Sequence, residues 1–424
     1  MIIKLAWKNL WLKPLNTILS FILLASSVAI ITVLILLQNQ FDKKFYDSIE
    51  NIDLVLGAQG SPLQVLLSSV YQMDAPTGNI DYEEAKKWMA NPFVKEAIPL
   101  AFGDNFHGYK ILGTTPQYIE KYGGTLLEGT MFKNPLEVVI GSTIASNFKL
   151  AVGDTFLGSH GAVEHGEVHE NHPYRIVGIL KPTDRILDNL VVSNIESVWA
   201  VHDHASDDAP VDHATEVHDH QDGEHHNHDH KDEVAEVHNP EDGKEITAVL
   251  ISFRNKMGLI TWPRIIAQNT KMQAVLPAVE INRLISMFGV GIESLKYLAY
   301  GIMLLSGISI FVILYNRLKE RKYEFALIRI HGGTSRQLLQ LVVIESLLLC
   351  LIGFIFGTII GRFCLGFISL AAQEEYKMSF NPLEVVWKNE TTLFILTLCI
   401  GLLSAVIPAL KAYSMNISKT LANA

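Results

Sequence analysis

The sequence predicts an α-helical membrane protein with four transmembrane helices and a large α+β periplasmic domain between the first and second spans. The chain has 424 residues, of which 49% are hydrophobic, and its mean hydropathy is +0.24. Four long apolar runs account for this composition, and about 260 residues of mixed polarity separate the first run from the second. The composition therefore excludes an ordinary soluble protein.

The first apolar run, Leu15 to Leu37, has 23 residues without a charged side chain, which is enough to cross a hydrocarbon layer of about 30 Å. Lys4, Lys8 and Lys13 precede it without any acidic residue, and this places the N-terminus in the cytoplasm. A cleaved signal peptide is the rival interpretation, but the run is too long for one and no small-x-small cleavage site follows it. The remaining predicted spans are residues 297–315, 338–360 and 392–410.

The charges between the spans indicate the orientation of the whole chain. Residues 317–336 carry six Lys or Arg against two Glu, whereas residues 363–391 carry four acidic and two basic residues. Short loops rich in Lys and Arg stay in the cytoplasm. Both termini are therefore expected inside, and Gln38 to Lys296 outside.

The basic loop, residues 316–337, contains a predicted short helix from Tyr323 to Ile330. Gly332 and Gly333 follow it, as expected at a helix C-terminus. This helix is polar on one side and apolar on the other, so we expect it to contact another protein on the cytoplasmic side.

Two features of the third span point to packing. Gly353, Gly357 and Gly361 repeat every four residues, and this spacing lets a neighbouring helix approach closely. We favour a neighbour in the same subunit; the alternative is an interface between two subunits. Glu345 is a carboxylate well inside an apolar run. Its position two turns from the cytoplasmic edge favours a structural role, hydrogen-bonded or paired with Arg, over a role in transport.

The segment between the first and second spans has the mixed helix and strand patterns of an α+β domain. Residues 138–140, 175–180 and 249–253 read as strands, 81–89 and 143–148 as helices, and 152–154 as a turn. Residues 41–49 and 278–296 have helical patterns that continue the first and second spans outward. The cysteines Cys350, Cys364 and Cys399 lie in or beside apolar spans, so this domain has no disulfide framework.

Residues 201–240 form a tract with ten histidines, twelve Asp or Glu and one lysine, Lys231. Low hydrophobicity with many like charges predicts a mobile loop. Imidazoles and carboxylates are common zinc ligands, so the tract is expected to bind Zn²⁺ or another divalent transition metal. The candidate metal ligands are His202, His204, His213, His218, His220, His225, His226, His228, His230 and His238.

The spacing of these histidines leaves the form of the site open. The pairs His202/His204, His218/His220 and His228/His230 share a side if the backbone is extended, and His226/His230 if it is helical. A second, thinner cluster comprises His160, His165, His169 and His172. The alternative is a solvated acidic loop whose metal affinity is incidental. All-N/O ligands argue mildly against Cu(I).

The chain lacks the motifs of an enzyme. It has no Gly-x4-Gly-Lys-Ser/Thr sequence, and in Gly103 to Lys110, which comes closest, Tyr109 stands at the lysine position. It also lacks a nucleophile elbow and a His-Glu-x-x-His sequence. We expect no catalytic residue, no ATP bound by this chain and no nucleic-acid partner.

Several segments, in order, resemble those of one family. They are Ala6-Trp-Lys-Asn-Leu10 before a span, Val138-Val-Ile-Gly-Ser-Thr143 with Leu150-Ala-Val-Gly-Asp154 and Tyr174-Arg-Ile-Val-Gly178, Glu324-Phe-Ala-Leu-Ile-Arg-Ile-His-Gly-Gly333, Glu345-Ser-Leu-Leu-Leu, and Pro408-Ala-Leu-Lys-Ala412. Together they resemble the MacB/FtsX-type permeases of ABC transporters, also called type VII or mechanotransmission transporters. The chain departs from the MacB pattern in lacking a fused ATPase domain and in carrying the histidine tract.

The resemblance implies three regions. Residues 1–37 would hold the cytoplasmic N-terminus and first span, 38–296 a MacB-like periplasmic core domain with stalk helices, and 297–424 an FtsX-like domain. It also implies a permease homodimer in the bacterial inner membrane, in contact with lipid and with two copies of an ABC ATPase subunit. ATP would bind only to that partner. The implied coupling residues are Glu324, Ala326, Leu327, Arg329, Gly332 and Gly333.

Three functions remain open at this stage. The leading one is a permease working in zinc or other divalent metal transport or homeostasis, with a periplasmic metal-binding protein as a further partner. The second moves a lipoprotein, a peptide or a hydrophobic compound, with metal only regulating it. The third is an FtsX-like activator of a cell-wall hydrolase. The sequence does not set the direction of transport.

Overall fold

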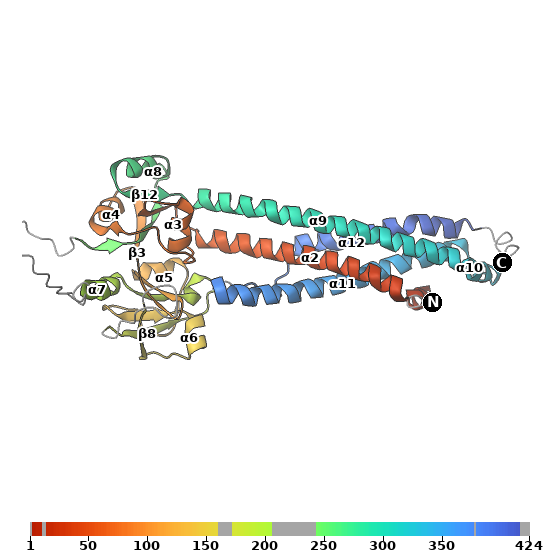
Figure 1. Ribbon diagram of the computed structural model, residues 1–424, viewed down its shortest axis with the longest axis horizontal. Helices are drawn as coiled ribbons and strands as arrows, with labels where there is room; N and C mark the ends of the chain where they lie inside the picture. Colours follow the sequence, from red (N-terminus) through yellow and green to blue (C-terminus); the bar gives the residue numbers. More distant parts are fainter. Residues whose placement is uncertain (1, 11–13, 160–171, 206–242, 377–378, 416–424) are drawn as a thin grey trace, which may run out of the picture. The chain divides into compact units, whose positions relative to one another are not determined.

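The computed structural model describes residues 2–10, 14–159, 172–205, 243–376 and 379–415 (Figure 1). The chain divides into two compact units. We call Met1–Lys44 with Arg283–Ala424 the helical unit, and Phe45–Asn282 the α/β unit.

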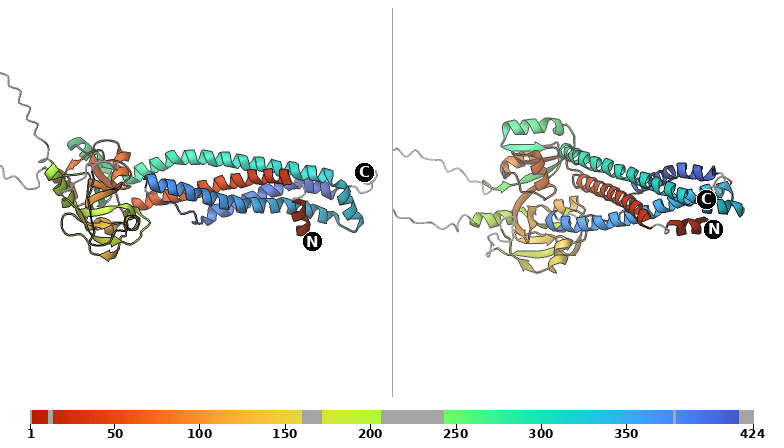
Figure 2. Two further views of the ribbon diagram at one scale, coloured as in Figure 1. Left: turned by 60° about the horizontal axis from the view of Figure 1, so that its bottom comes forward. Right: turned by 45° about the vertical axis from the view of Figure 1, so that its right-hand side comes forward.

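The helical unit is built from long apolar helices, which run side by side in Figures 1 and 2. Its helices, two of which extend into the α/β unit, are α1 (Ile2–Leu10), α2 (Pro14–Ser48), α9 (Pro277–Glu320), α10 (Lys322–Ile330), α11 (Ser335–Tyr376) and α12 (Trp387–Tyr413). Among the described residues, α2, α9, α11 and α12 are the four that are long and apolar enough to cross a membrane. Each predicted span lies within one of them, so the predicted four-span fold is confirmed.

The glycines of α11 bring it against α2 of the same chain. A Cβ atom added at Gly357 would lie 2.7 Å from the carbonyl oxygen of Ala25, and one at Gly361 would lie 2.8 Å from that of Ala29. Only a residue without a side chain allows the two backbones this close. The glycine repeat therefore serves packing within one subunit, as the sequence favoured.

Small polar residues join the other helices. The Ser404 hydroxyl of α12 donates to the Gly307 carbonyl of α9 at 2.7 Å, and the Ser346 hydroxyl of α11 donates to the Gly401 carbonyl of α12 at 2.7 Å. Ser20 of α2 and Ser309 of α9 share a hydrogen bond of 2.5 Å. In an apolar environment, such bonds and close contacts replace the hydrophobic effect as the force that associates helices.

The segment between α11 and α12 is tied to its neighbours. Arg362 donates to the carbonyls of Pro382 and Glu384 and, at 2.6 Å, to the Glu390 carboxylate. The Gln40 side chain of α2 exchanges two hydrogen bonds of 2.7 Å with the backbone of Asn381. Residues 379–386 therefore follow a defined path.

The α/β unit is built on a ten-stranded mixed sheet in the order β12-β1-β11-β3-β4-β9-β6-β8-β5, with β7 also paired to β8. A two-stranded sheet pairs β10 with β2. The strands are β1 (Leu54–Ala58), β2 (Ile80–Asp81), β3 (Val94–Phe106), β4 (Tyr109–Thr114), β5 (Leu126–Gly129), β6 (Glu137–Ile140), β7 (Thr155–Phe156), β8 (Tyr174–Leu180), β9 (Val191–Asn194), β10 (Glu245–Ile246), β11 (Ala248–Phe253) and β12 (Met272–Val275). The helices are α3 (Pro62–Ser69), α4 (Tyr82–Met89), α5 (Pro116–Lys121), α6 (Ser142–Phe148), the 3-10 helix η1 (Ile186–Asn189), α7 (Ile195–Ala205) and α8 (Gly258–Asn269).

The long strand β3 joins two lobes of this unit. Its first half pairs with β11 and its second half with β4, with a register shift between Phe102 and Asn105. One hydrophobic core, around Leu54, Ile251 and Trp262, lies in the first lobe. A second core, around Ile111, Val138 and Tyr174, lies in the other. A single strand therefore gives both lobes a common backbone.

The elements predicted for this unit are confirmed. The three predicted strands correspond to β6, β8 and β11, and the two predicted helices to α4 and α6. Asp81 caps α4 by accepting a hydrogen bond of 2.6 Å from the Glu84 N–H, which explains where that helix begins. Gly153 has a φ of +102°, as the predicted turn requires.

Candidate functional site

The helix α10 follows α9 after a break at Arg321. Arg321 donates from Nε to the Glu324 carboxylate at 2.7 Å, and its guanidinium lies 5.9 Å from the centre of the Phe325 ring. A carboxylate in the first helical turn interacts favourably with the helix dipole. These contacts fix the start of α10. Since α9 continues to Glu320, the non-helical part of the predicted loop 316–337 is short.

One face of α10 is packed into the helical unit. Phe325 and Ala326 are buried, and Phe325 belongs to the hydrophobic core that also contains Leu318, Leu338 and Val342. Ala326, a predicted coupling residue, therefore lies on the buried face of α10. The packing means that α10 moves together with α9 and α11.

The end of α10 is a Schellman motif. The Gly332 N–H donates to the Arg329 carbonyl at 3.2 Å, and the Gly333 N–H donates to the Ile328 carbonyl at 2.9 Å. Gly332 has a φ of +91°, and a Cβ atom at Gly333 would lie 2.7 Å from the Ile328 carbonyl oxygen. Both glycines are thus required by the backbone, as their position in the sequence predicted.

The next helix, α11, starts directly after this turn with a capping box. The Thr334 N–H donates to the Gln337 side chain at 2.9 Å, and the Gln337 N–H donates to the Thr334 hydroxyl at 3.3 Å. The turn between α10 and α11 is therefore held by hydrogen bonds at both of its ends.

The outer face of α10 is exposed and partly apolar. Tyr323 and Ile330 are 50% and 56% exposed, and Glu324 is also exposed. Leu327 and Arg329 are half-buried, and Gly332 is exposed. Sequence reasoning did not select Tyr323 or Ile330. Their seven-residue separation, which places both on one helix face, is a signal that could have identified them.

A buried arginine ties the end of α9 to the rest of the helical unit. Arg317, in the last turn of α9, donates from Nη1 to the Glu345 carboxylate of α11 at 3.1 Å. Its Nη2 donates to the Thr17 hydroxyl of α2 and to the Leu10 carbonyl of α1, the latter at 3.4 Å. One side chain thus connects four helices, and the pairing with Arg predicted for Glu345 is confirmed.

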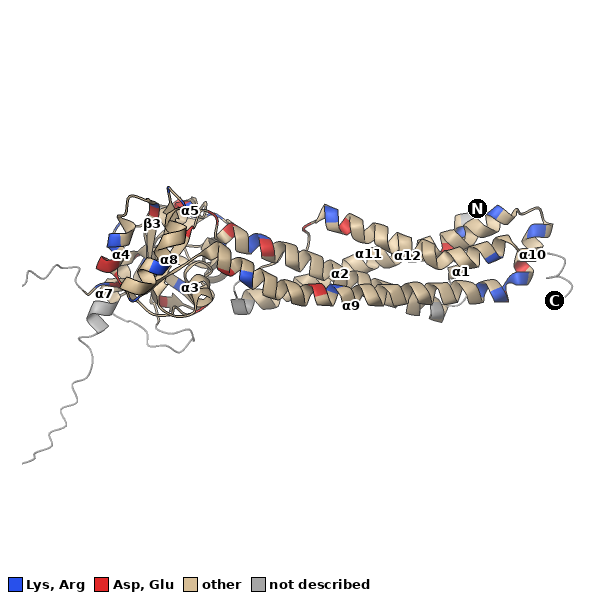
Figure 3. Ribbon diagram, turned by 90° about the horizontal axis from the view of Figure 1, so that it is seen from above, with Lys and Arg blue, Asp and Glu red and all other residues tan. Residues whose placement is uncertain are grey.

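Basic residues gather at the same end of the helical unit, around α10 and α1 (Figure 3). Lys411 of α12 donates to the Tyr315 hydroxyl at 2.7 Å and lies 4.5 Å from the centre of that ring. Arg317 is buried, however, so it does not contribute to this positive surface.

Most of the predicted metal ligands, His213 to His238, lie outside the residues that the structure describes. Residues 202 and 204 lie in the helix α7, so the extended backbone under which they would share a side is not present there. Of the thinner cluster, only His172 belongs to the described part of the chain. Within the described residues, no group of three or more His, Cys, Asp or Glu is placed to hold a metal ion.

Comparisons with known proteins match both regions of the chain. Residues 17–212 match the family model of the MacB-like periplasmic core domain, and residues 297–417 match that of the FtsX-like permease C-terminal domain. No protein in a search of curated sequences matches the chain.

Two solved structures are similar to the chain. One is the periplasmic region of MacB from Actinobacillus actinomycetemcomitans, with 10% identity and a TM-score of 0.34 over 57% of this chain and 97% of that one. The other is the extracellular domain of the noncanonic ABC-type transporter YknZ from Gram-positive bacteria, with 11% identity and a TM-score of 0.30 over 53% of this chain and 98% of that one.

Proposed function

Because the chain belongs to the MacB/FtsX-type ABC transporter permeases, which work with an ABC ATPase, we propose that it relays motion from such an ATPase through α10 to its MacB-like periplasmic core domain. The observation that carries this proposal is the two-sided character of α10. Phe325 and Ala326 are buried in the helical unit, while Tyr323, Glu324 and Ile330 are exposed. A helix held on one side and exposed on the other can pass a displacement from a partner to the helices beneath it.

The rest of the cytoplasmic end supports a mechanical role. The Schellman motif and the capping box keep α10 at a defined angle to α11, and Arg317 links α9 to α1, α2 and α11. A push on α10 therefore acts on several helices at once. The segment Gly103 to Lys110 comprises the end of β3, the turn at His107 and Gly108, and the start of β4.

The experiment is to measure ATP hydrolysis by the complex of this chain with its co-expressed ATPase, reconstituted in nanodiscs. We expect Tyr323→Ala with Ile330→Ala to reduce the permease-dependent rate to about a tenth, because exposed apolar side chains at the centre of a contact supply much of its energy. Neither substitution alters the buried face of α10.

The matched control is Leu383→Ala. Leu383 is 78% exposed but lies between α11 and α12, so the rate should stay unchanged. A normal rate in the α10 double variant, with the complex intact, would contradict the coupling role.

We propose that the complex acts on a divalent transition metal, with zinc as the first candidate. The histidine tract would capture or sense this metal on the periplasmic side. The composition of residues 201–240 supports this, since ten imidazoles and twelve carboxylates offer many ligand sets. In this proposal two permeases and two ATPase subunits form the complex, both termini lie in the cytoplasm, and a periplasmic metal-binding protein exchanges metal with the tract.

One observation favours a second load, a lipoprotein, a peptide or a hydrophobic compound. Arg317 and Arg362 form ion pairs with Glu345 and Glu390, so these charges are compensated within the chain and do not line an ion path. Spans of this kind suit transmission of motion more than conduction of a cation. In this second function, metal would only regulate the complex. In the third, an FtsX-like activator of a cell-wall hydrolase, motion would also pass through α10.

A further inference from the structure

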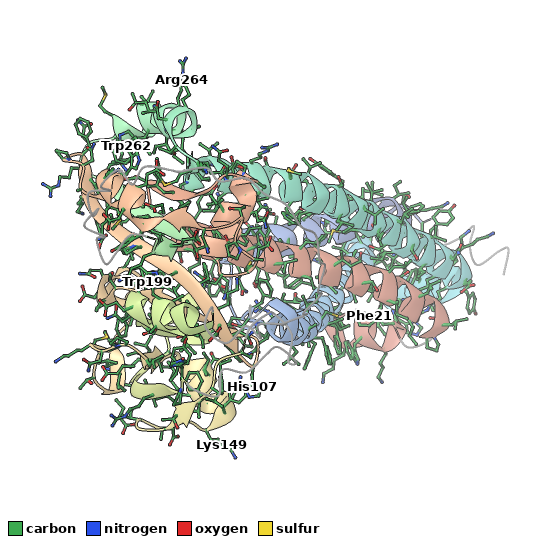
Figure 4. All side chains as sticks on the ribbon, turned by 60° about the vertical axis from the view of Figure 1, so that its left-hand side comes forward. Phe21, His107, Lys149, Trp199, Trp262 and Arg264 are labelled. Carbon is green, nitrogen blue, oxygen red and sulfur yellow. The ribbon has the colours of Figure 1, made fainter. Side chains whose placement is uncertain are left out.

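The helix α8 and the turn before it present an apolar stripe to solvent. Ile260 is 80% exposed and Met257 is 59% exposed. Positions 257, 260 and 264 are separated by three and four residues, so they share one side of the helix. Arg264, the third residue of this set, extends away from α8 in Figure 4.

The opposite side of α8 is firmly held, so the stripe is not the result of a frayed helix. Trp262 and Ile266 are buried in the core of the first lobe. The Trp262 ring lies 4.8 Å from that of Phe253 in β11 and 5.1 Å from that of Trp88 in α4. The apolar side chains needed for folding are therefore already inside, and Met257 and Ile260 are additional to them.

The charged residues of the segment that holds the stripe have one sign. From Arg254 to Lys271 the sequence contains Arg254, Lys256, Arg264 and Lys271 and no Asp or Glu, although the chain has a net charge of −10. Lys256 forms an ion pair with Asp53. Arg254 precedes Met257 and Ile260 in the sequence and Arg264 follows them, which is compatible with an interface that has an apolar centre and a cationic rim.

A hollow of about 680 Å³ has Arg254, three residues before Met257 in the sequence, in its lining. Its charged lining residues are Lys86, Lys95, Arg254 and one carboxylate, Glu96, so cations predominate there. The Arg254 N–H donates to the Phe93 carbonyl at 2.8 Å, and the Phe93 side chain is itself 47% exposed. We call Phe93, Arg254, Met257, Ile260 and Arg264, together with this hollow, the α8 surface.

We propose that the α8 surface docks a helix of a second protein whose apolar stripe is flanked by Asp and Glu. A stripe with helical spacing matches a partner stripe of the same spacing, and acidic flanks complement the cationic rim. An anionic membrane fits less well, because helices that lie on membranes insert Trp and other large apolar groups, whereas Trp262 is turned into the core. The hollow also suits a protein side chain better than a lipid surface.

The test uses the full chain in nanodiscs of phosphatidylcholine and three synthetic peptides of about 20 residues, a length that gives a stable helix when bound. The first peptide has Leu at helical spacing flanked by Glu. The second has Lys in place of Glu, and the third has the composition of the first in scrambled order. Binding is measured by fluorescence anisotropy, with the signal of empty nanodiscs subtracted.

We expect the Glu-flanked peptide alone to bind. Ile260→Ser and Arg264→Glu should each weaken its Kd about tenfold or more, because the first removes an apolar contact and the second reverses a charge of the cationic rim. Leu127→Ser is the matched control, since Leu127 is 62% exposed on the edge strand β5, and its Kd should be that of the parent. Since Ile260 and Arg264 are exposed, thermal unfolding of these variants should match that of the parent.

Equal binding of the three peptides, or a Kd unaffected by Ile260→Ser, would overturn the proposal. A co-sedimentation assay with phosphatidylglycerol vesicles tests whether α8 contacts an anionic membrane instead. If the nanodiscs bind these vesicles and Ile260→Ser abolishes this binding, α8 is a membrane contact and the proposed protein partner is wrong. The proposal does not depend on the coupling role of α10, so either can fail without the other.

Discussion

At the scale of single residues, Arg317 shows how one buried charge is compensated. Its guanidinium has the Glu345 carboxylate, the Thr17 hydroxyl and the Leu10 carbonyl as partners, which together use both of its terminal nitrogens. A buried ion pair adds little net stability over an apolar pair of the same size, but the loss of one partner leaves the other charge without compensation.

We therefore expect Arg317→Met to destabilise the helical unit by about 3 kcal/mol. The double variant Arg317→Met/Glu345→Met should recover most of that loss, because no charge then remains buried. Thermal unfolding of the purified chain in detergent, read as a double-mutant cycle, measures the coupling between the two residues. If the single and double variants melt at the same temperature, the pair does not interact.

Lys110 of β4 is a second residue with an unusual environment. Its Nζ donates to the Asp74 carbonyl and lies 5.1 Å from the centre of the Phe102 ring. Burial lowers the pKa of Lys110 to about 8, although the nearby Asp74 carboxylate acts in the opposite direction.

Because only the neutral amine reacts with acylating reagents, labelling of Lys110 should reach half of its maximum near pH 8. Removal of the Asp74 charge by Asp74→Asn removes the one influence that raises the pKa of Lys110, so the midpoint should move to a lower pH. Mass spectrometry of peptides from the labelled full chain measures both midpoints. An upward shift in Asp74→Asn would contradict the stabilisation of the charged Lys110 amine by the Asp74 carboxylate.

At the scale of elements, the contact of α11 with α2 depends on glycines in a graded way. A Cβ atom at Gly353 would meet the Leu24 Cδ2 atom at 2.7 Å, and that flexible side chain can move. At Gly357 the obstacle is the Ala25 backbone, also at 2.7 Å. At Gly366 nothing lies within 4 Å.

Gly357→Ala should therefore separate α11 from α2 and destabilise the helical unit by about 1–3 kcal/mol, as other overpacked sites do. Gly353→Ala should cost less. Gly366→Ala should be neutral or stabilise by up to about 1 kcal/mol, since Ala favours the helix over Gly. The order of the three melting temperatures in detergent checks this prediction, and a Gly357→Ala variant as stable as Gly366→Ala would contradict it.

The elements differ in how far the sequence predicted them. The long helices α2, α9, α11 and α12 were predicted because their apolar composition is local information. The strands β6, β8 and β11 were predicted because each is a short run rich in apolar residues that include Val and Ile. The edge strand β5 and the helix α8, which contains Pro263, carry no such local signal, and their formation depends on the neighbours that they pair with or cover.

At the scale of the whole molecule, the histidine tract allows a direct test of the proposal that the protein handles zinc. Replacing its ten histidines with Asn keeps the length and the acidic charge of the tract, whereas metal ligands are lost. We expect calorimetry on the full chain to show a reduced zinc stoichiometry in this variant at neutral pH. We also expect the parent chain to release zinc below about pH 6, because protonated imidazole does not bind metal.

Cells that produce the Asn variant should show altered zinc content and growth under chelation or zinc excess. A matched variant in which the acidic residues of the tract become Asn or Gln, with its histidines kept, separates metal binding from charge. Unchanged zinc stoichiometry in the Asn variant would remove the metal assignment, while the coupling role of α10 would stand.

The sequence alone determined the four spans, the two glycines that end α10 and the family resemblance, because each depends on composition or on residues adjacent in the chain. It also indicated that Glu345 is paired, because a carboxylate in an apolar run needs a partner. Only the tertiary structure decided that the partner is Arg317, that Ala326 is buried while Tyr323 and Ile330 are exposed, and that α8 presents Ile260 to solvent. These facts depend on which helix face meets which neighbour, and residues far apart in the chain decide that together.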